Sequence, residues 1–158
     1  MQAEIQIEPA QEPHKQKVLD LLKAQMAEHH IEIAPERILR AIDGYLNHPE
    51  LGFILIARRQ KEIVGLACVS LIWTIEYGGK SCWLEELYVS PEARGTGTGS
   101  QLLNEVIKRA RQLECDAIDL EVESDHQRAE ALYQRAGFRK HTRTRWVKSL
   151  RTSPGESA

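Results

Sequence analysis

A glycine-rich loop between a predicted strand and a predicted helix most constrains the fold of this chain. The loop reads Arg94-Gly95-Thr96-Gly97-Thr98-Gly99-Ser100; it follows a strand that ends at Val89 and precedes a helix whose apolar face begins at Leu102. A helix N-terminus has unpaired N–H groups and partial positive charge, and glycines let a bulky anion approach the main chain. The loop therefore predicts a phosphate site in a domain that mixes strands with helices.

Two common nucleotide motifs do not fit the loop, and a merely flexible turn is the simplest alternative. A dinucleotide fingerprint needs G-x-G-x-x-G, but the last position is Ser100 when counted from Gly95 and Leu102 when counted from Gly97. A Walker loop needs Gly-Lys-Ser or Gly-Lys-Thr, which is absent.

Hydrophobic spacing predicts the remaining elements. Strands are expected over residues 3–7, 51–57, 62–73, 81–89, 118–122 and 138–147, and helices over 14–29, 35–46, 102–113 and 126–136. The fold class is therefore α/β (α+β), with a mixed, mostly antiparallel twisted sheet flanked by helices. We expect one domain over residues 1–148 and a disordered tail over 149–158.

Composition argues against several classes of partner. The 158 residues include 21 basic and 23 acidic ones, a net charge of -2 that attracts neither nucleic acid nor an anionic membrane. The longest apolar stretch, Ile63 to Trp73, is too short to span a bilayer, and residues 1–9 do not resemble a secretory signal. A cytoplasmic protein is predicted.

The three cysteines and six histidines lack the spacing of metal ligands, so no metal is expected.

Two motifs in the correct order resemble the GCN5-related N-acetyltransferase (GNAT) family. Arg94-x-x-Gly97-x-Gly99 is similar to the family's acyl-CoA loop, Q/R-x-x-G-x-G/A, and Ala129-x-x-Leu132-Tyr133-x-x-x-Gly137-Phe138 is similar to its second motif. The agreement runs from about Trp83 to Phe138. The resemblance implies a GNAT-like acyl-CoA N-acyltransferase fold and acetyl-CoA as the co-substrate.

The resemblance also assigns the residues that bind the cofactor. It implies that backbone groups of Leu87 and Val89 pair with the pantetheine arm and that N–H groups from Gly95 to Ser100 hold the pyrophosphate. Where many relatives carry Asn, this chain has His126. The candidate cofactor-binding residues are Leu87, Tyr88, Val89, Arg94, Gly95, Thr96, Gly97, Thr98, Gly99, Ser100 and His126.

Acetyl transfer to an amine needs a proton acceptor, because an alkyl amine with a pKa of about 10.4 is mostly charged at neutral pH. Glu85 and Glu86 stand in an otherwise apolar strand that resembles that of diamine acetyltransferases, in which the first acid takes the proton. We assign Glu85 as the base and Glu86 as a partner for the amine's charge. Strict alternation sends the two acids to opposite faces, unless a bulge re-aims one; alternatively, one or both face solvent.

Tyr133 is the third catalytic candidate. The family places a tyrosine there to hydrogen-bond or protonate the departing thiolate. The competing interpretation is that Tyr133 simply packs its helix against the sheet. The oxyanion is expected to meet the backbone N–H of Leu87, by analogy with the family.

The sequence says less about the identity of the acceptor than about that of the cofactor. Glutamates 76, 85, 86, 121 and 123 lie in segments expected near the sheet's opening, which favours a cationic acceptor. The first choice is the primary amine of a small polyamine- or diamine-like metabolite; a protein N-terminus or lysine is second, and a non-catalytic acyl-CoA-binding module is the remaining alternative. Trp73, Ile75 and Tyr77 are candidates for the acceptor wall or for strand packing. Whether the chain forms a homodimer is left open.

Overall fold

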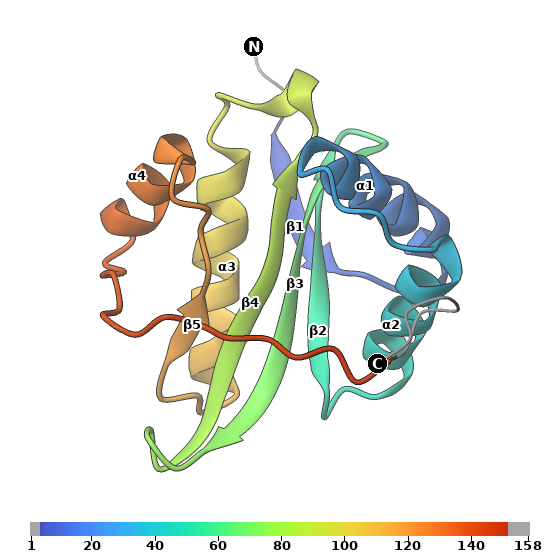
Figure 1. Ribbon diagram of the computed structural model, residues 1–158. Helices are drawn as coiled ribbons and strands as arrows, with labels where there is room; N and C mark the ends of the chain where they lie inside the picture. Colours follow the sequence, from blue (N-terminus) through green and yellow to red (C-terminus); the bar gives the residue numbers. More distant parts are fainter. Residues whose placement is uncertain (1–3, 152–158) are drawn as a thin grey trace.

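The computed structural model describes residues 4–151 and contains a five-stranded sheet in the order β1-β2-β3-β4-β5 (Figure 1). Neighbouring strands are antiparallel except β4 and β5, which are parallel. This confirms the predicted mixed, mostly antiparallel sheet. The strands are β1 (Ile5–Pro9), β2 (Gly52–Arg59), β3 (Glu62–Thr74), β4 (Gly79–Val89) and β5 (Ile118–Leu120).

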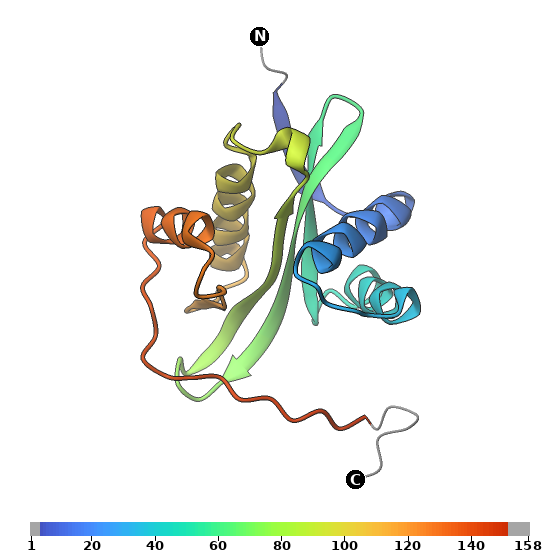
Figure 2. The ribbon, with the colours of Figure 1, turned by 45° about the horizontal axis from the view of Figure 1, so that its top comes forward.

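In the described part of the chain, four α-helices cover the two faces of the sheet. Helices α1 (Lys15–Glu28) and α2 (Pro35–Asn47) lie on one face, and α3 (Thr98–Gln112) and α4 (Gln127–Arg135) lie on the other (Figures 1 and 2). Each face has its own core, because successive strand residues point to opposite sides. On the α3 face Leu55, Val69, Leu84 and Leu102 are buried, and on the α1–α2 face Val18, Ile42, Ile56 and Leu66 are buried.

A β-bulge interrupts β4 at the two adjacent glutamates. Val69 of β3 pairs with Leu84, whereas the preceding Cys68 pairs with Glu86, so Glu85 is the extra residue. Leu84 and Leu87 both pack into the α3 core, and the two residues between them therefore face the α1–α2 side together. The sequence analysis allowed for a bulge at this pair without predicting one. The bulge is present, and it puts both acids on one face.

The sheet opens between β4 and β5 beyond this bulge. The two strands pair only over Cys82–Leu84 and Ile118–Leu120, so β5 ends two residues earlier than the sequence predicts. Residues 86–89 of β4 keep their pairing with β3 but have no β5 partner on the other edge. We call the space between these edges the β4–β5 opening.

The predicted last strand, Phe138–Val147, is wrong. Residues 139–151, here called the C-terminal arm, have no strand assignment and run across the strands rather than beside one of them (Figures 1 and 2). A strand exists only where a neighbour supplies ladder hydrogen bonds, and no strand within residues 4–151 supplies them to the arm. Its contacts with the rest of the protein are made by side chains, including Arg143 with Glu76 and Arg145 with Glu121.

The other predicted elements are confirmed to within a few residues. Helix α3 begins at Thr98, inside the glycine-rich loop, and Gly137 ends α4 with a φ of 92°. The predicted first strand, residues 3–7, begins at Ile5, and residue 3 lies outside the described part. Most of the predicted disordered tail, residues 149–158, also lies outside it; only residues 149–151 are described, and they are exposed. Among residues 4–151, no helix is long and apolar enough to cross a membrane.

Candidate active site

The glycine-rich loop is held in a fixed shape by glycine geometry and two threonines. Gly95 and Gly97 have φ values of 73° and 83°, and Gly97 is the N-cap of α3. The Thr96 hydroxyl donates to the Ala93 carbonyl at 2.7 Å and lies 2.9 Å from the Thr98 hydroxyl. The first N–H groups of α3 have no partner within the helix, and a side chain added at Gly97 would meet open space. The loop thus offers backbone donors to an anion.

Two of the candidate cofactor residues connect the loop to α1. Arg94 donates to both carboxylate oxygens of Glu28, at 2.7 and 2.8 Å, and its Nε donates to the Val89 carbonyl at 2.8 Å. The Tyr88 hydroxyl also donates to Glu28, at 3.1 Å, and the Tyr88 ring is buried in the α1–α2 core. In this structure the side chains of Arg94 and Tyr88 therefore fix the loop against α1, and the Arg94 side chain also occupies the carbonyl of Val89.

The backbone of Leu87 and Val89 lies on the free edge of β4. Ser90 N–H donates to Val64 of β3, so strand alternation turns the polar groups of Val89 and Leu87 toward the β4–β5 opening. A carbon added at Gly99 would lie 3.9 Å from Val89 and 3.8 Å from Leu132, so α3 begins close to this edge. An extended molecule in the opening would meet strand-type hydrogen-bonding groups here and the loop N–H groups next.

His126 caps α4, and a neighbouring arginine lies over the loop. His126 Nδ1 accepts from the Ala129 N–H at 3.1 Å, and its ring stacks on His29 with centroids 6.4 Å apart. His29 also approaches Glu123 at 3.4 Å, so side chains from α1 and the α4 side meet across the opening. The Arg128 Nη2 lies 3.7 Å from where a carbon on Gly95 would stand. The sequence analysis missed Arg128, because nothing separated it from the other arginines nearby.

A cavity of about 700 Å³ lies between α2 and the face of β3 and β4 that carries the bulge. We call it the α2 cavity. Glu85 and Glu86 are the acids in its lining, and Arg37 and Arg40 are the basic residues. The remaining lining residues are uncharged, namely Leu22, Met26, Ile33, Ile38, Ala41, Ile42, Gly44, Tyr45, Leu51, Ile54, Cys68, Ser70 and Leu71. The bulge thus presents two carboxylates to a mostly apolar cavity.

A hydrogen-bonded chain fixes Glu85. The Ser70 hydroxyl donates to Glu85 at 2.7 Å and lies 2.6 Å from the Tyr45 hydroxyl. Burial raises the pKa of Tyr45 well above its ordinary range, so this phenol stays protonated and can donate to Ser70. Tyr45 and Ser70 come from α2 and β3, and no local motif could have identified them as neighbours of Glu85.

Glu86 is the acid whose proton affinity the fold changes most. Burial, reinforced by the negative charge of Glu85, raises the pKa of Glu86 to about 7, while His29 and Gln25 act to lower it. Gln25 is itself buried, and its Oε1 has no hydrogen-bond partner. A carboxyl group with this pKa exchanges its proton readily at neutral pH.

Tyr133 reaches the same region from the other face of the sheet. Its ring packs edge-to-face on Phe138, with centroids 5.7 Å apart, at the margin of the α3 core. Burial, followed by the negative charge of Glu86, raises the pKa of Tyr133 to about 12. Tyr133 therefore both packs and keeps its proton at neutral pH.

Other residues that the sequence analysis placed near the acceptor lie outside the α2 cavity. Trp73 and Ile75 are 80% and 99% exposed on the β3–β4 hairpin and do not line the α2 cavity. The Tyr77 hydroxyl instead donates to Asp119 at 3.1 Å. Glutamates 76, 121 and 123 also lie outside the cavity lining. The β3–β4 hairpin projects past the region that α2 covers, which places Trp73, Ile75 and Glu76 outside the cavity. Glu123 lies instead at the β4–β5 opening, where it approaches His29.

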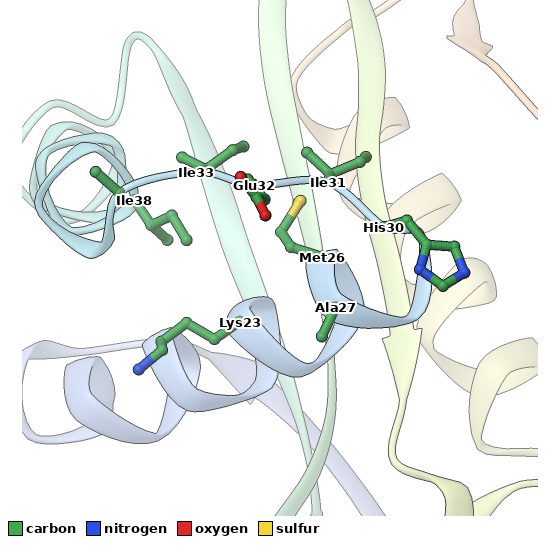
Figure 3. A pocket seen from close by; sticks show the side chains of 9 residues that line it. Lys23, Met26, Ala27, His30, Ile31, Glu32, Ile33 and Ile38 are labelled. Carbon is green, nitrogen blue, oxygen red and sulfur yellow. The ribbon is translucent and has the colours of Figure 1, made fainter.

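A second cavity of about 660 Å³ adjoins the first. It lies between α1 and the segment that leads to α2, and Figure 3 shows Met26 pointing from α1 toward the segment that carries Ile31 and Ile33. Met26, Ile33 and Ile38 line both cavities, so these apolar side chains form the wall between them. Within residues 4–151, no group of three His, Cys, Asp or Glu side chains is arranged to hold a metal ion.

The fold and this arrangement of residues define an acyltransferase-type domain. Residues 15–138 match the acetyltransferase (GNAT) family, and the chain therefore belongs to it.

Similar proteins have acetyltransferase names or the same fold. A mycothiol acetyltransferase from Beutenbergia cavernae is 31% identical over 111 residues, which are 60% of this chain and 37% of that protein. An integron cassette protein from the mobile metagenome of Cole Harbour Salt Marsh superposes with a TM-score of 0.84 at 26% identity, covering 94% of this chain and 92% of that one. An aminoglycoside N-acetyltransferase solved with CoA has a TM-score of 0.80 at 17% identity, covering 95% and 97%. The chain spans less than half the length of the curated relatives that it matches.

The raised pKa of Glu86 predicts a pH dependence of stability. The value of about 7 lies above the ordinary 4.5, so the folded protein holds this proton more tightly than the unfolded chain. The resulting stabilisation is complete below the unfolded value and is lost as pH rises through about 7. Glu86→Gln should therefore gain unfolding free energy relative to wild type between about pH 5 and pH 8.5, as measured by urea denaturation. Glu62→Gln, at an exposed strand acid, is the control; parallel profiles for wild type and Glu86→Gln would contradict the prediction.

Proposed function

We propose that this protein transfers the acetyl group of acetyl-CoA to the primary amine of a small cationic metabolite by direct attack on the thioester. The observation that carries the proposal is the β4 bulge, which turns Glu85 and Glu86 into the α2 cavity where β4 loses its β5 partner. An amine in the cavity and a thioester in the β4–β5 opening would meet at this point. We further propose that residues 1–148 act as one domain.

The β4–β5 opening fits an acyl-CoA. Backbone groups of Leu87 and Val89 would pair with the pantetheine amides, and the N–H groups from Gly95 to Ser100 would receive the diphosphate. Arg128 adds a positive charge over the loop, and Arg94 would gain a second anionic partner beside Glu28. The CoA complex of the similarly folded aminoglycoside N-acetyltransferase supports the same class of cofactor.

The electrostatics of the two acids favour Glu86 as the proton acceptor and Glu85 as the partner for the amine's charge. Glu85 is held by Ser70, whereas the pKa of Glu86, about 7, suits a base at neutral pH. This reverses the assignment made from the sequence, in which Glu85 was the base. The amine would lose its proton to Glu86, directly or through water, and its lone pair would attack the thioester carbonyl carbon.

Collapse of the tetrahedral intermediate breaks the C–S bond and releases a thiolate, and the nitrogen gives up its second proton through water, which leaves the neutral amide. The oxyanion would be met by the Leu87 N–H. Tyr133, with a pKa of about 12, would donate a hydrogen bond to the departing sulfur. Full proton transfer from this phenol to a thiolate is uphill, because an ordinary thiol has a pKa of about 8.5.

The charged and apolar residues of the α2 cavity limit which acceptor amines can bind there. The two acids favour a cationic group at the reacting end, and the apolar wall favours a carbon chain behind it. Arg37 and Arg40 on α2 disfavour a second cation near them, so a diamine would have to keep both amines close to Glu85 and Glu86. A protein N-terminus or lysine is the second candidate, and acyl-CoA binding without catalysis is the third. The three free cysteines are compatible with a cytoplasmic enzyme.

A thiol-release assay with acetyl-CoA tests the acceptor class. Diamines, polyamines, ω-amino acids, aminoglycosides and short peptides with free N-termini or lysines should be compared at equal concentration. We expect a small diamine-like amine to give the highest kcat/KM, at least about tenfold above any peptide, because the cavity binds one compact cation. Peptide preference would favour the second candidate. Binding of acetyl-CoA without turnover of any amine would favour the third.

Substitutions at the acids and the tyrosine test the mechanism. Glu86→Gln should lower kcat about a hundredfold and abolish the rise of kcat/KM with pH through about 7, because the proton acceptor is lost.

Tyr133→Phe should slow acetylation about tenfold or more with unchanged folding. Glu62→Gln and Tyr77→Phe remove the same groups outside the cavity and serve as controls. A pH profile that persists in Glu86→Gln and disappears in Glu85→Gln would restore the assignment from the sequence.

Alanine substitutions at two glycines test whether the glycine-rich loop binds acetyl-CoA. Gly97 and Gly78 have similar φ values, 83° and 71°, and an added carbon meets no atom within 4 Å at either site. Alanine should therefore cost each position about 1 kcal/mol of stability for the left-handed backbone. Only Gly97→Ala should also weaken acetyl-CoA binding, by about tenfold or more in calorimetry, because the new methyl occupies the diphosphate's approach. Equal acetyl-CoA affinity of the two variants would remove the loop from the proposal.

A further inference from the structure

Two cysteine thiols meet where the turn between α3 and β5 packs on β4 (Figure 1). The Cys82 thiol, on β4, donates to the Cys115 sulfur in the turn at 3.3 Å, and both cysteines are free. Cys82 lies in the α3 core, whereas Glu85 and Glu86 face the α2 cavity from the other side of the sheet. Neither cysteine is among the described residues that line that cavity. The thiol pair is therefore separate from the proposed acetyl-transfer chemistry.

The end of α3 fixes the backbone at Cys115. Glu114 has a φ of 60°, and its N–H donates to the Arg111 carbonyl at 3.0 Å. The Cys115 N–H donates to the Ala110 carbonyl at 2.9 Å. These two bonds form a Schellman motif, which ends a helix in one defined geometry. Cys115 is thus placed by main-chain hydrogen bonds and not only by the packing of its side chain.

The backbone next to Cys82 is joined to the same turn. The Asp116 N–H donates to the Lys80 carbonyl at 3.0 Å, and the Cys82 N–H donates to the Ala117 carbonyl at 2.9 Å. The Lys80 ammonium donates to the Leu113 carbonyl at 3.1 Å. A disulfide holds its sulfurs about 2 Å apart, so the two thiols need to approach by roughly 1.3 Å. Such a shift is small enough for side-chain rotation to supply while these backbone contacts stay in place.

We propose that Cys82 and Cys115 form an oxidative modification site, at which a peroxide converts the two thiols into a reversible disulfide within the chain. Cys115 is partly exposed and Cys82 is 1% exposed, so the peroxide reaches Cys115 first. Burial also raises the pKa of the Cys82 thiol to about 12, which keeps this thiol protonated. The site therefore has one sulfur that meets the oxidant and a second sulfur held behind it.

The reaction balances with hydrogen peroxide as the oxidant. In the first step the Cys115 sulfur attacks a peroxide oxygen; the O–O bond breaks, an S–O bond forms, and water leaves with the thiol's proton. In the second step the Cys82 sulfur attacks the Cys115 sulfur; the S–S bond forms, the S–O bond breaks, and the Cys82 proton leaves with the hydroxyl group as a second water. The two thiols are oxidised to one disulfide, and the peroxide is reduced to two waters.

Cys68 provides an internal control. It is 3% exposed in the core of the α1–α2 face, on the other side of the sheet from the Cys82 thiol. Burial raises the pKa of the Cys68 thiol well above its ordinary range. Cys68 should therefore keep its thiol while the other two cysteines react.

Peroxide treatment of the reduced protein tests the site. After a few equivalents of hydrogen peroxide, thiol titration in denaturant should fall from three thiols to one, and the intact mass should fall by two hydrogen atoms. Peptide mapping should find Cys82 joined to Cys115, and dithiothreitol should restore all three thiols. The oxidised protein should melt about 5 °C or more above the reduced protein, because the bond closes a long loop in the unfolded chain.

Alanine variants separate the roles of the two thiols. Cys82→Ala should stop the reaction after its first step, so that Cys115 gains oxygen and the mass rises instead of falling. Cys115→Ala should resist the same dose of peroxide, and Cys68→Ala should behave as wild type. A wild-type protein that only gains oxygen at Cys115, or that links either cysteine to Cys68 or to a second chain, would overturn the inference. So would a disulfide that lowers the melting temperature, because the pair would then close only by distorting the fold.

Discussion

The extra residue in β4 is the constraint on which the site depends. Side chains alternate along a strand, so one inserted residue changes which face every later side chain occupies. Leu84 and Leu87 can both reach the α3 core only because Glu85 and Glu86 share the opposite face. Because the apolar residues on both sides of the pair pack against α3, the two acids must lie on the α1–α2 face. The same insertion coincides with the end of β4–β5 pairing, so the acids lie beside the opening of the sheet.

The opening and the α2 cavity are joined by the side chains of α1. Glu28 holds Arg94 and Tyr88, whereas one turn earlier Gln25 acts on the pKa of Glu86. Met26 lines the α2 cavity from the same turn of α1. An anion that competes with Glu28 for Arg94 would therefore act on the helix whose Met26 lines the α2 cavity. This arrangement connects the glycine-rich loop to Glu86 through a few contacts.

The site also has an energetic cost that the rest of the fold must offset. A carboxyl group whose pKa is raised by burial destabilises the folded protein when it ionises. Two adjacent acids in a largely apolar cavity increase that cost, and the Tyr45–Ser70–Glu85 chain reduces it for only one of them. The two buried cores supply the stability that permits this. A protein without use for a proton acceptor would gain by placing apolar side chains at the bulge.

The sequence by itself determined the features that are local in the chain. Periods of 2 and 3.6 residues located nearly all of the strands and helices, and the glycine spacing located the loop at the head of α3, because these patterns reflect neighbours along the backbone. Only the tertiary structure decided the bulge, the shared face of Glu85 and Glu86, and the meeting of Tyr45, Ser70 and Gln25 with them. It also decided that residues 138–147 form no strand in this chain, despite a strand-like sequence. Pairing and burial depend on partners distant in sequence, and a local pattern states what a segment can form but not which neighbour it finds.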